Sequence, residues 1–201
     1  VLAGTVETAV NALWDAAPLV GDRVLVIGAG MVGCALAALL GRIPGVECTL
    51  VDVDPARAAT AAALGVAFAQ PADAPGDRDL VFHASATSAG LQRALDLLAP
   101  EGRVIELSWY GDAPVSVELG GAFHAGRLAV VASQVGRVAP ARRGTRSTDD
   151  RLALALELLR DPLFDALITG SSPFEELPDV MARLAAGTLP ALCHTITYDE
   201  G

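Results

Sequence analysis

The strongest constraint in this sequence is a glycine-rich turn between two apolar runs. The β-branched run Val24-Leu25-Val26-Ile27 leads into Gly28-Ala29-Gly30-Met31-Val32-Gly33, which has the spacing GxGxxG. In this pattern the first glycine permits a tight turn, the second lets a phosphate approach the backbone, and the third lets the next helix pack closely on the strand. The free N–H groups that begin the helix attract anions. The segment therefore predicts a strand, turn and helix that bind the pyrophosphate of a dinucleotide.

An acidic residue follows the turn at the distance that this motif requires. Asp52 lies 19 residues after Gly33, at the end of a predicted strand. A carboxylate there accepts hydrogen bonds from both ribose hydroxyls and repels a 2′-phosphate, which favours NAD(H) over NADP(H). The alternative is that Asp52 caps the next helix, a role that suits Asp54 better. Arg57 could stack on adenine, reach a ribose oxygen, or tolerate a phosphate.

Strand and helix patterns alternate along the whole chain. We expect strands at 24–27, 47–51, 80–83, 103–107, 128–132 and 192–198, and helices at 5–17, 31–42, 55–64, 88–98, 120–125, 149–159 and 174–186. This alternation predicts an α/β fold with a doubly wound parallel sheet, the Rossmann fold. Such sheets bind ligands where the strand order reverses, which directs attention to the turns after Ile27, Val51, His83 and Leu107.

Composition excludes several classes of protein. The net charge of −10 argues against nucleic-acid binding. All 14 basic residues are arginine, so a Schiff-base lysine, a Walker A lysine and a Tyr-x-x-x-Lys pair are excluded. The three cysteines include no CxxC pair, which favours a reducing cytoplasm. Residues 24–41 carry no charge, but their division by glycines favours a buried strand and helix over a membrane span.

Several short segments, taken in order along the chain, resemble those of a known protein family. They are Val6-Glu7-Thr8-Ala9-Val10-Asn11-Ala12-Leu13-Trp14, Val20-Gly21-Asp22-Arg23, the glycine turn with Asp52, Gly102-Arg103-Val104-Ile105-Glu106-Leu107, Tyr110-Gly111, and Cys193-His194-Thr195-Ile196-Thr197-Tyr198. Over nearly its whole length the chain resembles the cofactor-binding domain of the medium-chain dehydrogenase/reductase family, the zinc alcohol dehydrogenase group.

The resemblance implies a domain organisation and an activity. Residues 1–192 would form the NAD(P)-binding domain, and residues 193–201 a strand that returns to a catalytic domain preceding Val1. The activity would be NAD-dependent hydride transfer between nicotinamide and a small alcohol or carbonyl substrate. A homodimer would form through an edge strand such as 128–132. This chain would supply cofactor binding and none of the catalytic residues.

The resemblance also assigns cofactor contacts. The segment after the strand at 80–83 would line the riboses, and the segments after the two later strands would hold the nicotinamide carboxamide. His194 stands where the family often has an arginine near the pyrophosphate, and an imidazole is largely uncharged at neutral pH. The expected cofactor-binding residues are Gly28, Ala29, Gly30, Met31, Val32, Gly33, Asp52, Val53, Asp54, Arg57, Ala84, Ser85, Ala86, Thr87, Leu107, Ser108, Trp109, Ser133, Gln134 and His194.

A metal site is not expected in this segment. Ala3 occupies the place of a family zinc ligand and cannot bind metal, and Glu7 is at best a substitute; any zinc would depend on residues before Val1. The three cysteines stand in apolar runs and are expected to fill the core. His83 is expected to be a packed histidine or a cofactor contact, and His124 a surface residue. Trp109 and Tyr110 would either wall the pocket or pack in the core.

Three other functions remain open from the sequence. A zinc-free NADPH-dependent enone or quinone reductase would share the family fold, although Asp52 argues against NADPH. A nucleotide-sensing module would bind the cofactor without turning it over. A methyltransferase also has a glycine-rich turn and a following acid, but its turn usually lacks the third glycine.

A basic loop stands out in this acidic chain. Arg137, Arg142, Arg143 and Arg146 fall within ten residues. They would either bind a carboxylate or phosphate on the substrate, or pair in a solvated loop with Asp149, Asp150 or a partner subunit.

The substrate hypothesis for this loop can be tested by kinetics. Replacing Arg142 and Arg143 together by Ala should raise KM for an anionic substrate, because their bidentate contacts are lost, and leave cofactor affinity unchanged. An unchanged KM would contradict an anion-binding role.

Overall fold

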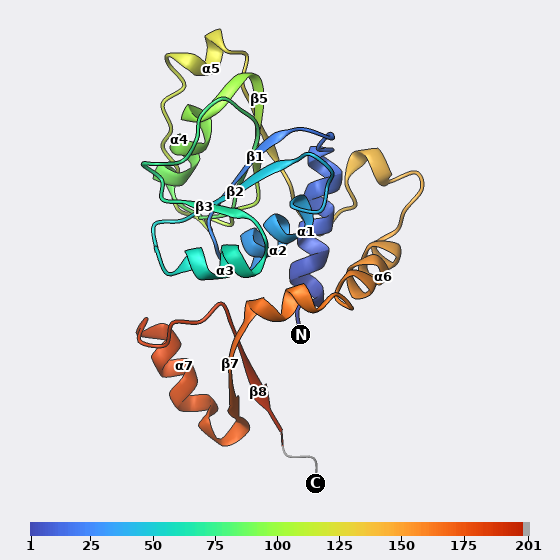
Figure 1. Ribbon diagram of the computed structural model, residues 1–201, viewed down its shortest axis with the longest axis vertical. Coiled ribbons are helices and arrows are strands. Elements are labelled where there is room, and N and C mark those ends of the chain that lie inside the picture. The colour runs from blue at the N-terminus through green and yellow to red at the C-terminus, as the bar shows by residue number, and fades with distance from the viewer. Residues whose placement is uncertain (199–201) are drawn as a thin grey trace.

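The computed structural model describes residues 1–198, and its centre is a six-stranded parallel sheet (Figure 1). The strand order is β3-β2-β1-β4-β5-β6, with every pair parallel. The order reverses between β1 and β4, so the predicted doubly wound sheet is confirmed. The strands are β1 Arg23–Ile27, β2 Glu47–Val51, β3 Ala67–Ala69, β4 Arg78–His83, β5 Leu98–Glu106 and β6 Ala129–Ala132.

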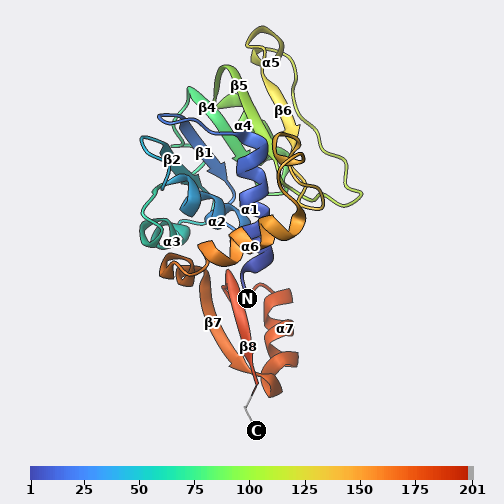
Figure 2. The ribbon, with the colours of Figure 1, turned by 90° about the vertical axis from the view of Figure 1, so that its right-hand side faces the viewer.

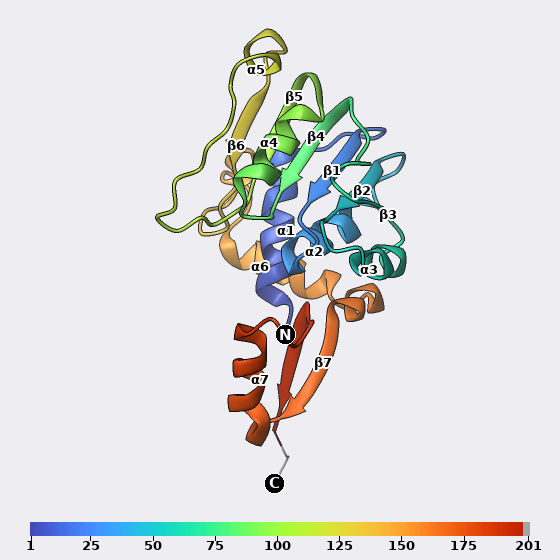
Figure 3. The ribbon, with the colours of Figure 1, turned by 90° about the vertical axis from the view of Figure 1, so that its left-hand side faces the viewer.

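Helices cover both faces of the sheet. Val24 and Val26 of β1 join a core with α1, α2 and α6, whereas Leu25 and Ile27 join a second core with α4. Figure 2 shows α1 and α6 in front of the sheet, and Figure 3 shows the opposite side. Burial on both faces explains why the strands are continuously apolar. The helices are α1 Ala3–Ala16, α2 Met31–Leu40, α3 Arg57–Ala63, α4 Ser88–Asp96, α5 Ala122–Ala125, α6 Thr148–Leu158 and α7 Leu177–Ala185.

The uncharged stretch at residues 24–41 is divided as expected. It forms β1, the glycine turn and the ten-residue helix α2, eight of whose residues are buried. Between residues 1 and 198, no helix is both long enough and apolar enough to span a membrane.

The last part of the chain forms a separate unit. β7 (Ile168–Pro173) and β8 (Cys193–Thr197) pair in parallel as a two-stranded sheet, and α7 connects them. Figure 1 shows this unit below the six-stranded sheet. The predicted final strand exists, but its partner β7 was not expected, because Ile-Thr-Gly-Ser-Ser-Pro lacks the apolar alternation of a strand. Residues 199–201 of the expected returning segment lie outside the described residues.

Several further elements differ from the sequence predictions; the largest boundary shift is that β5 begins at Leu98 and not at Arg103. The strand β3 was missed, because it has only three residues and two of them are alanine. The third helix begins at Arg57 and not at Pro55, because Asp54 first forms a turn in which its Oδ1 accepts from the N–H of Ala56 (2.9 Å). Three short 3₁₀ helices at Pro140–Arg142, Pro162–Leu167 and Phe174–Glu176 complete the described elements.

A buried arginine ties α6 to α1 and to the basic loop. Arg151 is 2% exposed. Its Nε and Nη2 donate to Glu7 Oε1 (3.1 and 3.0 Å), and its Nη1 donates to Asn11 Oδ1 (2.5 Å). The carbonyls of Val135 and Arg137 accept the remaining donors (2.6 and 3.3 Å). Every nitrogen of this buried cation is therefore satisfied, as burial of a charge requires.

We predict that Arg151→Met lowers the free energy of unfolding by about 3 kcal/mol, because it leaves the half-buried Glu7 carboxylate and two carbonyls without their donor. Arg160→Met is the matched control. Arg160 is 77% exposed, and within residues 1–198 it pairs only with Glu157, so its loss should cost less than about 0.5 kcal/mol. Chemical denaturation of both variants measures the difference. Equal stabilities of the two variants would contradict the stabilising role of Arg151.

Candidate functional site

The three glycines of the turn have different structural roles. Gly28 has φ +108°, and a Cβ on it would lie 2.8 Å from the backbone of Ala84. A Cβ on Gly33 would lie 1.8 Å from the carbonyl oxygen of Gly28, so only glycine lets α2 lie this close to the turn. Gly30 is exposed, and a Cβ on it would meet nothing within 4 Å. Gly28 and Gly33 are thus required by the fold, whereas Gly30 leaves open space next to the backbone.

Asp52 binds the turn directly. Its Oδ2 accepts from the N–H of Ala29 (2.7 Å), and its Oδ1 accepts from the N–H of Asp54 (2.9 Å). A carboxylate has about four acceptor sites, so each oxygen keeps capacity for a further donor. Neither aspartate caps α3, because the N-cap residue is Ala56 and no side chain caps the helix. Asp54 lies in the preceding turn, where its Oδ1 accepts from Ala56 N–H and its Oδ2 lies 3.4 Å from Nε of Arg57.

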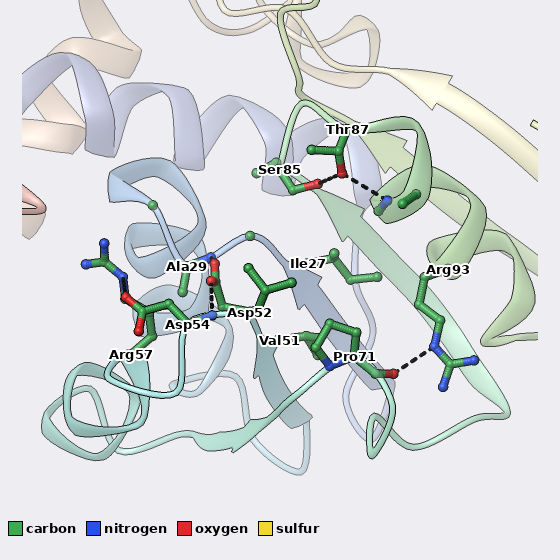
Figure 4. Close-up of a pocket in the computed structure, with 16 residues that line it drawn as sticks. Ile27, Ala29, Val51, Asp52, Asp54, Arg57, Pro71, Ser85, Thr87 and Arg93 are labelled. Carbon is green, nitrogen blue, oxygen red and sulfur yellow. Dashed lines mark hydrogen bonds and ion pairs between the residues drawn. The ribbon is translucent and has the colours of Figure 1, made fainter. Parts of the chain in front are cut away.

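A cavity of about 480 Å³ opens at the carboxyl ends of β1, β2 and β4, where the strand order reverses (Figure 4). This is the place that the sequence predicted for a ligand. Figure 4 shows Arg57 on one side of the cavity and Arg93 on the other. Ten of the expected cofactor-binding residues line it: Gly28, Ala29, Gly30, Asp52, Val53, Asp54, Arg57, Ala84, Ser85 and Thr87.

Six lining residues were not among those expected. Ile27 and Val51 are the last residues of their strands, and the strand-end rule could have found them. Arg93 lies on α4, and its Nε donates to the carbonyl of Pro71 (2.9 Å). No sequence pattern links these two residues, because their proximity depends on the packing of α4 beside the β3–β4 connection. The remaining two are Ala89 and Gly90.

The other expected residues lie outside this cavity. Met31, Val32 and Gly33 form the first turn of α2. Trp109 is 86% exposed, and the Ser133 hydroxyl donates to Asp15 (2.7 Å). His194 is on β8 of the two-stranded sheet, where its Nε2 lies 3.1 Å from the Ser172 hydroxyl, and it does not line the cavity. Ala86, Leu107, Ser108 and Gln134 also do not line the cavity.

A polar cluster lies at the ends of β4 and β5. His83 is fully buried, with Nδ1 2.8 Å from Glu106 Oε2 and Nε2 2.7 Å from the Ser85 hydroxyl. Burial acts to raise the pKa of Glu106, but hydrogen bonds from His83 and Ser108 outweigh it and hold this pKa below its usual value. The Tyr110 hydroxyl donates to Glu106 (3.1 Å); burial and the Glu106 charge raise the pKa of Tyr110 to about 12. His83 is thus a packed, hydrogen-bonded histidine beside the cavity.

The structure also places the metal candidates. Within residues 1–198, no three His, Cys, Asp or Glu side chains gather as a metal site would require. Glu7, the possible substitute ligand, pairs with Arg151. Cys34 and Cys48 are buried, and burial raises the pKa of each thiol to about 12, as expected for core residues. Cys193 is half-buried and not in a disulfide.

The basic loop remains at the surface. Arg137, Arg142, Arg143 and Arg146 are exposed, and in the part of the chain described here none of them forms an ion pair with Asp149 or Asp150. The side chain of Arg143 donates through Nε to the Val138 carbonyl (2.7 Å).

Comparisons with solved structures support the fold. L-idonate 5-dehydrogenase from Escherichia coli K-12 matches with a TM-score of 0.80 and 18% identity over 98% of this chain. Benzyl alcohol dehydrogenase from Acinetobacter calcoaceticus matches with a TM-score of 0.76 and 16% identity over 98% of this chain. A short-chain alcohol dehydrogenase from E. coli CFT073, complexed with the cofactor NADH, matches with a TM-score of 0.72 and 19% identity over 92% of this chain.

The match covers only part of each neighbour. The chain spans 56% of the first two of those structures and 54% of the third. No family model and no curated protein matches the sequence. The chain therefore has the fold of about half of an alcohol or polyol dehydrogenase.

The turn geometry predicts effects of different size on stability at two glycines. Gly33→Ala should lower the free energy of unfolding by about 2–3 kcal/mol, because its methyl group would clash with the Gly28 carbonyl and force α2 away from β1. Gly30→Ala should change it by less than about 1 kcal/mol, because the added methyl group meets only open space. Thermal unfolding of the two variants checks this, and similar midpoints would contradict the close contact.

Proposed function

We propose that the chain binds NAD(H) in the 480 Å³ cavity and is the cofactor-binding part of an oxidoreductase of the alcohol dehydrogenase type. One observation carries the proposal: Asp52 is tied to the N–H of Ala29 and lines the same cavity as the glycine turn. A carboxylate and a phosphate-binding turn in one cavity suit a dinucleotide, which carries ribose hydroxyls next to a pyrophosphate.

The residues present fit this cofactor. Gly30 leaves room at the backbone for a pyrophosphate, and it directly precedes α2, whose first N–H groups are available to an anion. Asp52 keeps acceptor capacity for ribose hydroxyls, and its negative charge disfavours a 2′-phosphate. Arg57 and Arg93, on opposite sides, can stack on adenine or attract phosphate.

The chemistry assigned to this chain is binding and orientation. The nicotinamide ring, when bound, supplies hydride acceptance or donation. Asp52 and the glycine turn would hold the adenosine and pyrophosphate part. The segments at Leu107–Trp109 and Ser133–Gln134 remain our assignment for the carboxamide. The substrate would be a small alcohol or carbonyl compound, in keeping with the names of the fold neighbours.

The cofactor preference is tested by titrating the protein with NADH and NADPH, read by nicotinamide fluorescence. We expect tighter binding of NADH. Asp52→Asn should weaken NADH binding about 10-fold or more, because a charged acceptor is lost. It should also reduce the difference between the Kd of NADH and the Kd of NADPH. Gly30→Ala should fold normally and weaken binding of both dinucleotides.

Asp73→Asn is the matched control, because Asp73 is exposed and lies outside the cavity. Tighter binding of NADPH than NADH would show that the arginines outweigh Asp52, and it would favour an NADPH-dependent reductase. Binding of neither would contradict the proposed function.

A further inference from the structure

A continuous chain of polar side chains runs from the half-buried Glu106 to the cavity wall. Glu106 Oε2 lies 2.8 Å from His83 Nδ1, and His83 Nε2 lies 2.7 Å from Ser85 Oγ. Ser85 Oγ lies 3.0 Å from Thr87 Oγ1, which accepts from the N–H of Gly90 (3.0 Å). Ser85, Thr87 and Gly90 line the cavity, as Figure 4 shows for the two hydroxyls.

Glu106 determines the direction of these hydrogen bonds. Its pKa lies below the usual value, so its charged carboxylate only accepts, and His83 must donate from Nδ1. With its ring proton on Nδ1 and none on Nε2, the imidazole would accept the proton of the Ser85 hydroxyl at Nε2. The Ser85–Thr87 bond would then take its proton from Thr87, whose oxygen also accepts from the N–H of Gly90. In that arrangement both hydroxyls donate within this chain of side chains and present only lone pairs to the cavity.

The residues around this chain of side chains are closely packed. A Cβ on Gly90 would lie 2.2 Å from Ser85 Oγ and 2.7 Å from His83 Nε2. Ala86, which follows Ser85, has φ +53°, and its N–H donates to the Ser108 hydroxyl (3.1 Å). The Ser108 N–H in turn donates to Glu106 Oε1 (2.7 Å). The loops after β4 and β5 are thus held against each other by the same carboxylate.

We propose that His83 carries its single ring proton on Nδ1, and that Glu106 and His83 are positioning residues, which hold the Ser85 hydroxyl as a hydrogen-bond acceptor for a ribose hydroxyl of the bound dinucleotide. A ribose hydroxyl can donate to these two side-chain oxygens, whereas a phosphate oxygen only accepts and would find no proton on them. The arrangement thereby assigns the Ser85 and Thr87 hydroxyls to the ribose and not to the phosphates. This inference rests on the proposed function, and it adds two residues that contact no ligand themselves.

A double-mutant cycle on NADH affinity tests the proposal in the intact protein. Ser85→Ala removes the acceptor and should raise the Kd of NADH about 3- to 10-fold. Glu106→Gln offers an amide donor to Nδ1, which would move the imidazole proton to Nε2. Ser85 Oγ would then accept from His83 and would no longer donate its own proton to the ring. The Kd of this variant should rise by a similar factor. The double variant should be no weaker than Ser85→Ala, because Glu106 acts through Ser85.

Asp79→Asn is the matched control. Asp79 is a carboxylate on β4 that binds Arg23 of the neighbouring strand (2.8 Å), but it lies at the opposite end of the sheet from the cavity. Its replacement should lower stability and leave the Kd of NADH unchanged. If the Kd of NADH rises as much in Asp79→Asn as in Glu106→Gln, loss of stability alone explains the weaker binding of Glu106→Gln, and the proposal is overturned.

The remaining outcomes are also decisive. Additive effects of the two substitutions, or no effect of either, would overturn the positioning role while leaving the proposed NADH site intact. Failure of the unmodified protein to bind NADH or NADPH would overturn both. If Glu106→Gln does not fold, ¹⁵N NMR of the unmodified protein replaces it: a proton on His83 Nδ1 supports the chain, and a proton on Nε2 overturns it.

Discussion

The close contact between α2 and the turn after β1 is the constraint on which the site depends. Gly33 has no Cβ, and any Cβ there would fall 1.8 Å from the Gly28 carbonyl oxygen. This contact brings the beginning of α2 to the carboxyl end of β1, where the strand order reverses. The helix N-terminus, with its free N–H groups, is thereby placed at the mouth of the cavity. A larger residue would separate the phosphate-binding groups from the rest of the site.

Hydrogen bonds to carboxylates then hold the loops around that helix. Asp52 binds the N–H of Ala29 inside the glycine turn and the N–H of Asp54 after β2. Glu106 plays the corresponding part at the ends of β4 and β5, through His83 and Ser108. Charge-assisted hydrogen bonds to a carboxylate are stronger than neutral ones, so two acidic residues suffice to order four loops. Both acids thus bind groups of loops that lie at or beside the cavity.

A second rigid point lies on the other side of the molecule. Arg151 joins α6 to α1. It also donates hydrogen bonds to the carbonyls of Val135 and Arg137, which ties the basic loop to the two helices. Only a buried cation with five donors can satisfy Glu7, Asn11 and two carbonyls at once. The arginines of the loop itself stay exposed on this fixed base. Their charge therefore remains available to a ligand or partner.

Local sequence determined five strands of the main sheet and the half of the site that lies next to the glycine turn. Apolar β-branched runs, the GxGxxG spacing and an acid 19 residues later are features of consecutive residues, so Gly28, Gly30 and Asp52 were predictable. On the other wall the family resemblance predicted Ala84, Ser85 and Thr87, and tertiary structure alone decided the rest. Arg93, Pro71 and Gly90 reach the cavity through the packing of α4, and His83 meets Glu106 because β4 pairs with β5. Tertiary structure also decided that β8 pairs with β7, since the residue pattern of neither strand predicts which strand it pairs with. Contacts between residues far apart in the chain depend on how whole elements pack, which no local pattern records.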